Sequence, residues 1–102
     1  MRNITANAML NLKEVPQTLY VHGSIMTYHS DDKVEITESE SQGINPSILV
    51  LDLKVKVGTG PMKGTPKGFH YENSKPIAKT YSQVTIRYST EASMTVNVEI
   101  FG

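Results

Sequence analysis

Apolar and polar residues alternate most clearly over residues 18–28. Leu19, Val21 and Ile25 fall on one side of this segment, and Tyr20, His22, Ser24, Met26 and Tyr28 fall on the other. Successive side chains of a strand point to opposite faces, so the period of two predicts a β-strand. After a polar cluster at 29–32, the same alternation returns at Val34 and Ile36 and predicts a strand over 33–40. We expect the two strands to form an antiparallel hairpin, 18–28 with 33–40.

Residues 48–57 carry the strongest strand pattern in the chain. The segment opens with four consecutive apolar residues, and then Leu53, Val55 and Val57 alternate with charged residues. A continuous apolar run indicates burial on both faces, and the later alternation indicates one wet face. The pattern predicts a central strand that emerges into water on one side.

Alternation returns in the last quarter of the chain. Val84, Ile86 and Tyr88 alternate with polar residues in a strand expected over 77–88, and Met94, Val96, Val98 and Ile100 do so in the last one. Residues 89–92 between them are suited to a short turn. The spacing predicts a second hairpin that runs to the end of the sequence.

Two segments lack a clear period. Residues 1–17 are expected to form an edge strand or a partly ordered arm, because Pro16 ends any regular element there. Residues 58–76 contain four glycines and three prolines, at Gly58, Gly60, Gly64, Gly68, Pro61, Pro66 and Pro76. We expect a long irregular loop over 58–76, since these residues interrupt regular structure and long loops tend to be functional or mobile.

The whole pattern predicts one all-β domain over residues 1–102. Val, Ile and Thr number 27 whereas Ala numbers four, which favours strands over helices. Six or seven short strands with hairpin spacing predict an antiparallel β-sandwich, immunoglobulin-like in general architecture. A small, partly open β-barrel is the alternative, because a few strands can also close on themselves.

Composition narrows the functional classes. The absence of cysteine excludes disulfides, thiolate metal sites and a cysteine nucleophile. Ten basic and ten acidic residues give no net charge, so nucleic acid is not a favoured partner. The longest apolar run has four residues, and no leader-like apolar stretch follows the N-terminus, so we expect a cytoplasmic protein without a membrane partner.

Motifs for catalysis or cofactor binding are missing from the sequence. The glycine-rich segment fails the phosphate-loop pattern, because Lys63 precedes Gly64 instead of following it. His29 beside Asp31 and Asp32 has suitable ligand types for a metal, but adjacent aspartates are more often turn formers. We therefore predict no cofactor, no metal and no enzymatic activity; an enzyme with a dispersed site is the least favoured reading.

Charge is unevenly distributed along the chain. Residues 31–40 are acidic, whereas residues 54–79 are rich in lysine. One interpretation is a site for an anion or nucleic acid, with aromatic stacking surfaces beside the lysines. Its residues are Lys54, Lys56, Lys63, Lys67, Phe69, Tyr71 and Lys75. The simpler interpretation is a set of solvated lysines, and a third is attraction between the two segments.

The polar row of the 18–28 strand is the main interaction candidate. It carries Tyr20, His22, Met26 and Tyr28, and Tyr and Met are enriched at protein interfaces. The sequence alone does not tell which of the two rows of this strand faces the core. The favoured functional hypothesis is a small non-enzymatic binding or protein-interaction module that self-associates as a homodimer. Anion or nucleic-acid binding through 54–79 is the alternative.

Overall fold

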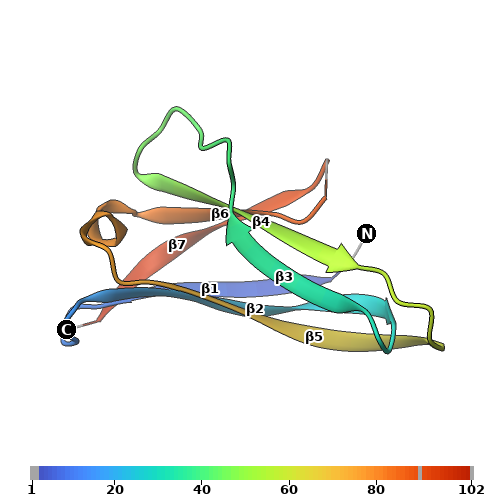
Figure 1. Cartoon of the computed structure of the whole chain (residues 1–102). Coiled ribbons are helices and arrows are strands. Elements are labelled where there is room, and N and C mark those ends of the chain that lie inside the picture. Colours follow the sequence, from blue (N-terminus) through green and yellow to red (C-terminus); the bar gives the residue numbers. More distant parts are fainter. Residues whose placement is uncertain (1–2, 90, 102) are drawn as a thin grey trace.

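The computed structural model describes residues 3–89 and 91–101, and it is built mainly from β-strands (Figure 1). The strands are β1 (Ile4–Asn11), β2 (Thr18–His29), β3 (Lys33–Glu38), β4 (Ile48–Lys56), β5 (Met62–Asn73), β6 (Gln83–Arg87) and β7 (Ser93–Phe101). A short 3₁₀ helix, η1 (Pro76–Thr80), precedes β6. The all-β prediction is therefore confirmed.

All seven strands belong to one sheet that curls toward closure. Its order is β3-β4-β6-β7-β1-β2-β5, and the two end strands, β3 and β5, approach each other. Figure 1 shows β1, β2 and β5 in one layer, with β4 and β6 across from them. The structure thus takes the alternative architecture, a small partly open barrel, whose two halves face each other as layers.

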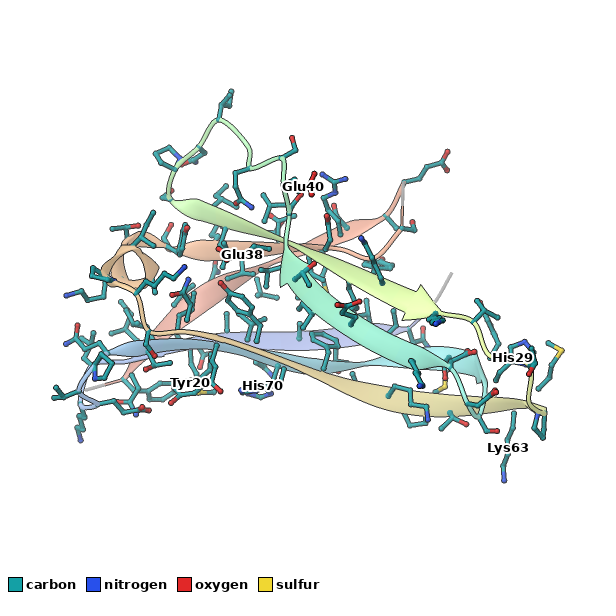
Figure 2. The ribbon with its side chains drawn as sticks, viewed as in Figure 1. Tyr20, His29, Glu38, Glu40, Lys63 and His70 are labelled. Atoms are coloured by element: carbon teal, nitrogen blue, oxygen red, sulfur yellow. The ribbon has the colours of Figure 1, made fainter. Side chains whose placement is uncertain are left out.

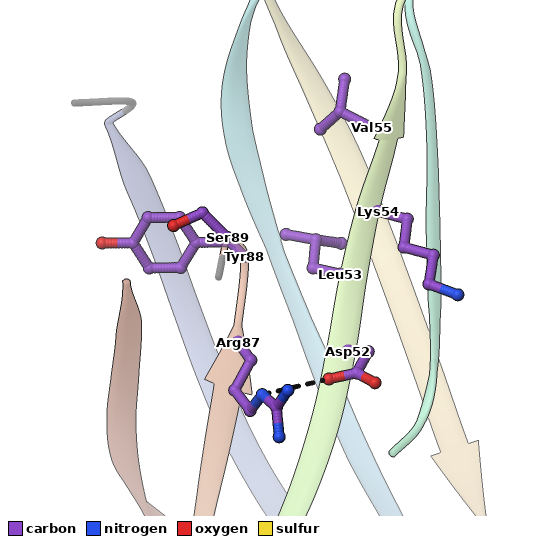
Figure 3. A pocket seen from close by; sticks show the side chains of 7 residues that line it. All are labelled: Asp52, Leu53, Lys54, Val55, Arg87, Tyr88 and Ser89. Carbon is purple, nitrogen blue, oxygen red and sulfur yellow. Dashed lines mark ion pairs between the residues drawn. The ribbon is translucent and has the colours of Figure 1, made fainter. Parts of the chain in front are cut away.

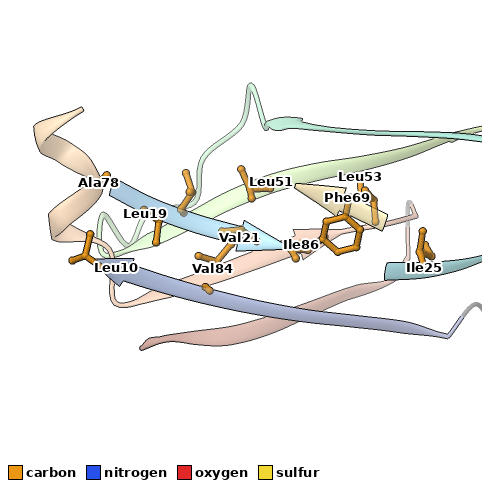
Figure 4. Close-up of a cluster of buried hydrophobic side chains, with 12 residues drawn as sticks. Leu10, Leu19, Val21, Ile25, Leu51, Leu53, Phe69, Ala78, Val84 and Ile86 are labelled. Atoms are coloured by element: carbon orange, nitrogen blue, oxygen red, sulfur yellow. The ribbon is translucent and has the colours of Figure 1, made fainter. Parts of the chain in front are cut away.

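The core lies between these two halves (Figure 4). Twelve buried apolar residues form it: Ala8, Leu10, Leu19, Val21, Ile25, Leu49, Leu51, Leu53, Phe69, Ala78, Val84 and Ile86. Burial of their side chains is the main force that holds the halves together. On β2 the row with Leu19, Val21 and Ile25 faces this core, so the row that begins at Tyr20 lies on the outer face.

Two strand pairs are parallel, which the antiparallel expectation did not include. β4 pairs in parallel with β6, and β1 pairs in parallel with β7. β5 and η1 separate β4 from β6 in the sequence, which provides the long crossover that a parallel pair requires. β7 pairs with two different strands along its length. Residues 93–97 pair with β6, and residues 98–101 pair with β1.

The predicted hairpin of 18–28 with 33–40 is wrong, although both strands exist. β2 pairs with β1 and β5, whereas β3 pairs with β4. The turn between them is held by the carboxylate of Asp32, which accepts the amide of His29 on one side and that of Gly58 on the other. These bonds tie the turn to the β4–β5 connection, and β3 continues along β4 instead of returning along β2.

The second predicted hairpin is confirmed, with a shorter first strand. β6 and β7 pair antiparallel, with Gln83 opposite Asn97 and Arg87 opposite Ser93. The strand expected from residue 77 begins only at Gln83, because Pro76 starts the 3₁₀ helix η1. Proline is well suited to a first helical turn, since its missing N–H would be unpaired there.

The long loop predicted over 58–76 is wrong for most of its length. Residues 62–73 form β5, which pairs antiparallel with β2. Pro66 is tolerated because it lies opposite Met26, whose amide bonds instead to the Asn3 carbonyl beside β1. Pro66 therefore sits at a position of this end strand where the pairing with β2 needs no N–H donor.

Residues 4–11 form an interior strand, which corrects the expected edge strand or arm over 1–17. β1 lies between β7 and β2 in the sheet. Ala6 lies opposite Gly23, and a Cβ at Gly23 would collide with the carbonyl of Thr5 and the Cα of Ala6. Glycine at 23 therefore allows β1 to approach β2 closely enough to cover the core.

Substitution of Gly23 tests this close approach. Gly23→Ala should lower the free energy of unfolding by about 3 kcal/mol, because backbone atoms must move to admit the methyl group. Urea denaturation measures the change. Gly43→Ala is the matched control, since a Cβ at Gly43 meets nothing within 4 Å. Equal stability of the two variants would contradict the role given to Gly23.

Candidate functional site

The outer surface of β1, β2 and β5 gathers the residues best suited to contact a partner. In the strand register, Met9 and Glu72 flank Tyr20, while Asn7 and His70 flank His22. We call this surface the tyrosine–histidine face. It consists of Asn7, Met9, Tyr20, His22, Met26, His70 and Glu72. These residues come from three strands, and only the fold brings them together.

Hydrogen bonds hold Tyr20 in place on the tyrosine–histidine face. Its hydroxyl donates to the Glu14 carboxylate, with 2.8 Å to Oε1 and 2.7 Å to Oε2. Asn11 Nδ2 also donates to Glu14 Oε1 at 3.0 Å, which fixes the carboxylate between the two side chains. The hydrogen bond to Glu14 raises the pKa of Tyr20, because it stabilises the protonated phenol. Tyr20 therefore presents a fixed aromatic ring.

A second ring lies beside Tyr20 on the same face. The centroids of Tyr20 and His70 are 6.0 Å apart and their planes are tilted by 39° (Figure 2). His70 Nε2 is 3.6 Å from Glu72 Oε1, and both side chains are more than half exposed. The two rings thus form an accessible aromatic pair with a carboxylate at its border.

A shallow hollow adjoins the tyrosine–histidine face on the side of β7. It has a volume of about 390 Å³ and is lined by Met9, Asn11, Lys13, Tyr20 and Phe101. Phe101 lies opposite Asn11 in the parallel pairing and is 49% exposed. The hollow is lined by both apolar and polar side chains, a mixture that is usual at protein contact sites.

The candidate interface residues named from the sequence fall partly within this site. Tyr20, His22 and Met26 are half-buried on the outer side of β2, and Tyr28 is 48% exposed near the end of the strand. Met9, His70 and Phe101 were not named as interface residues. Alternation along each strand was the available signal, but it does not show which strands are neighbours.

The candidate lysines lie on three separate elements. Lys54 and Lys56 lie on β4, Lys63 and Lys67 on β5, and Lys75 immediately precedes η1. Lys67 Nζ donates to the Ser30 carbonyl at 2.9 Å. Figure 2 shows Lys63 near the tip of β5, at the opposite end of the molecule from Tyr20. The structure therefore distributes these lysines along the barrel.

The two aromatic residues proposed to stack beside the lysines lie largely inside. Phe69 is 6% exposed and belongs to the core, so its assignment as a stacking surface is wrong. Tyr71 is half-buried, and its hydroxyl accepts a hydrogen bond from Asn73 Nδ2 at 3.1 Å. Burial raises the pKa of Tyr71 to about 12. Both rings contribute to the packing of the barrel.

Asp32 joins the end of β2 to the β4–β5 connection at one end of the barrel. It is 3% exposed, and its carboxylate accepts backbone amides from Gly58 at 2.6 Å, His29 at 3.0 Å and Tyr28 at 3.1 Å. The bond from Gly58 is the main reason that the pKa of Asp32 is lowered. A carboxylate that accepts several amides is stabilised in its charged form.

Asp31 also binds the connection between β4 and β5. Its carboxylate accepts the amides of Gly60 at 2.9 Å and Thr59 at 3.1 Å, and the bond from Gly60 is the main cause that lowers the pKa of Asp31. A Cβ at Gly58 or Gly60 would collide with this carboxylate. We call this unit the Asp31–Asp32 clamp. The acidic segment therefore contacts the 54–79 segment within the chain, through backbone amides.

The described part of the chain holds no group of three or more histidine, aspartate or glutamate side chains arranged to bind a metal ion. None of its helices has the length and apolar character needed to cross a membrane. Comparison with protein-family models, curated proteins and solved structures finds no match for this chain.

The Asp31–Asp32 clamp predicts a specific pH dependence. Its carboxylates have lowered pKa values in the folded state, so their contribution is present above the unfolded pKa of about 3.9 and is lost as pH falls below it. Replacing both residues by Asn should lower the melting temperature at pH 7 by roughly 5 °C or more and flatten its decline between about pH 5 and pH 2.

Thermal unfolding followed by circular dichroism at several pH values measures both effects. Glu35→Gln is the control, because Glu35 is an exposed carboxylate on β3 outside the clamp. It should leave the acid slope unchanged. An equally steep decline in the double Asn variant would show that the clamp does not control acid stability.

Proposed function

We propose that this chain is a non-enzymatic binding module that contacts proteins through its tyrosine–histidine face, and that its first partner is a second copy of itself. The observation that carries the proposal is the half-buried Tyr20, which Glu14 holds beside the exposed His70 ring and the hollow containing Met9 and Phe101. These residues lie on a sheet surface that no strand of the described chain covers.

The chemistry of this surface matches that of protein contact sites. Aromatic residues and methionine are enriched at the centre of interfaces, where a few anchors contribute most of the binding energy. Tyr20 is suited to be such an anchor, because its ring is already fixed by hydrogen bonds and loses little freedom on binding. Glu14, Lys13 and Glu72 supply a polar rim around it.

The end strands of the sheet provide a weaker route to self-association. β3 has only six residues and carries charged side chains such as Lys33 and Glu35. β5 contains Pro66, and the two strands approach each other instead of standing open. Short length, charge and proline all discourage pairing between molecules at an edge. A two-fold contact through the tyrosine–histidine face is therefore favoured over one through a strand edge.

Anion or nucleic-acid binding through 54–79 has less support. Its lysines are spread over β4, β5 and the start of η1, and Phe69 lies in the core. An electrostatic site of this kind would bind more weakly as salt increases. A contact through Tyr20, Met9 and Phe101 would respond little to salt.

Sedimentation velocity at low and moderate salt tests the proposal. We expect a dimer that forms at micromolar concentrations at both salt levels, and Tyr20→Ala should weaken it about tenfold through loss of a central anchor. Ile44→Ser is the control, since Ile44 is fully exposed in the connection between β3 and β4. Circular dichroism confirms that both variants remain folded.

Two outcomes would overturn this proposal. One is a protein that remains monomeric up to about a hundred micromolar, where an interface of ordinary size should be populated. The other is a dimer that Tyr20→Ala and Ile44→Ser leave equally strong, because its contact would then lie elsewhere.

A further inference from the structure

β4 continues beyond the end of its neighbour β6. The parallel pairing runs from Ile48 opposite Gln83 to Asp52 opposite Arg87, and β4 then extends to Lys56. After Arg87 the chain turns away, and the amides of Tyr88 and Ser89 both donate to the Ala92 carbonyl, at 3.1 and 3.3 Å. Figure 1 shows the β6–β7 hairpin diverging from the end of β4. β4 is therefore a central strand in its first half and an edge in its second.

The backbone of this second half has one unpaired side. The Val50 carbonyl accepts the amide of Ser39, which follows β3, so Val50 directs its backbone groups toward β3. Asp52, Lys54 and Lys56, at every second position after Val50, direct their backbone groups to the same side, where β4 pairs with β3. The intervening residues, Leu53 and Val55, therefore point their backbone groups toward the side of β6. The register gives the Leu53 carbonyl and the Val55 amide no ladder partner in the described chain.

A hollow lies along this unpaired backbone (Figure 3). It has a volume of about 610 Å³ and is lined by Asp52, Leu53, Lys54, Val55, Arg87, Tyr88 and Ser89. The ion pair between Arg87 Nε and Asp52 Oδ1, at 3.5 Å, marks the end where β6 stops.

We propose that this edge of β4 binds an extended strand of a partner polypeptide, which pairs with the Leu53 carbonyl and the Val55 amide. Backbone donors and acceptors at strand spacing fit a peptide in β conformation, because a helix satisfies its own backbone groups. The four residues from Leu53 to Lys56 give roughly 13 Å of edge, enough for a short strand. This site lies on β4, away from the tyrosine–histidine face, and does not depend on the proposed function.

Charge indicates which sequence the partner strand should carry. Asp52 has Arg87 beside it on β6, whereas Lys54 has Glu35 opposite it on β3 and, within the described residues, no strand partner on its other side. An acidic residue placed next to Lys54 would complete a row of alternating charges across the sheet. Its apolar neighbours would face inward beside Val55, which is half-buried. The expected pattern is apolar, acidic, apolar.

Nuclear magnetic resonance titration of the ¹⁵N-labelled protein with two capped five-residue peptides tests this proposal. One alternates Val with Glu and the other alternates Val with Lys. We expect the Glu peptide to shift the amide signals of Leu53 and Val55 and to give cross-strand nuclear Overhauser effects to β4. Lys54→Glu should weaken the Glu peptide roughly three- to tenfold and strengthen the Lys peptide, because attraction across the strands becomes repulsion.

Lys63→Glu is the charge-matched control, since Lys63 lies on β5 and not beside this hollow. It should leave both titrations unchanged, and so should Tyr20→Ala, which separates this site from the proposed dimer contact. The proposal is overturned if millimolar Glu peptide causes no shifts, if the shifts map away from β4, or if Lys54→Glu does not reverse the preference between the peptides.

Discussion

The divided pairing of β7 determines the shape of this molecule. Its first half pairs with β6 and its second half with β1, which joins the two halves of the barrel into one sheet. The core can then be buried between those halves. The residues of β7 that pair with β6 and those that pair with β1 do not overlap, so the β6–β7 hairpin diverges from β1, and β6 ends at Arg87 while β4 continues to Lys56. The end of β6 leaves the last residues of β4 with an exposed edge.

At the end of the barrel where β2 and β4 finish, the Asp31–Asp32 clamp holds the chain segments together. Two carboxylates accept amides from the β2 end and from the β4–β5 connection, and glycines at 58 and 60 leave room for them. From this connection β5 runs along β2, and the pairing of the two strands places His70 next to Tyr20. The Asp31–Asp32 clamp and the candidate contact surface thus lie toward opposite ends of the same strand pair.

Local pattern was sufficient to predict most strands but not their neighbours. Alternation correctly located β2, β4 and the β6–β7 hairpin, because a period of two reports burial on one face. It missed β5, whose Gly and Pro residues look irregular but are acceptable on an end strand. The pattern also led to the wrong prediction that β2 pairs with β3. It could not reveal the true partners, because bonds such as that from the Gly58 amide to the Asp32 carboxylate join residues far apart in the sequence. The sequence predicted only part of the tyrosine–histidine face for the same reason. Tyr20 and His22 share a strand, but His70 and Phe101 are brought near them only by strand pairing between distant segments.

Amide hydrogen exchange of the free protein, followed residue by residue, tests the divided pairing most directly. Amides with ladder partners should exchange slowly, including Val98, which donates to Ser82, and Leu51 within the β4–β6 pair. The amides of Val55 on β4 and Ala6 on β1 face the places where the hairpin diverges, and they should exchange much faster than their strand neighbours. Equal protection along the whole of β4 and β1 would contradict the account, because it would mean that both edges are already paired.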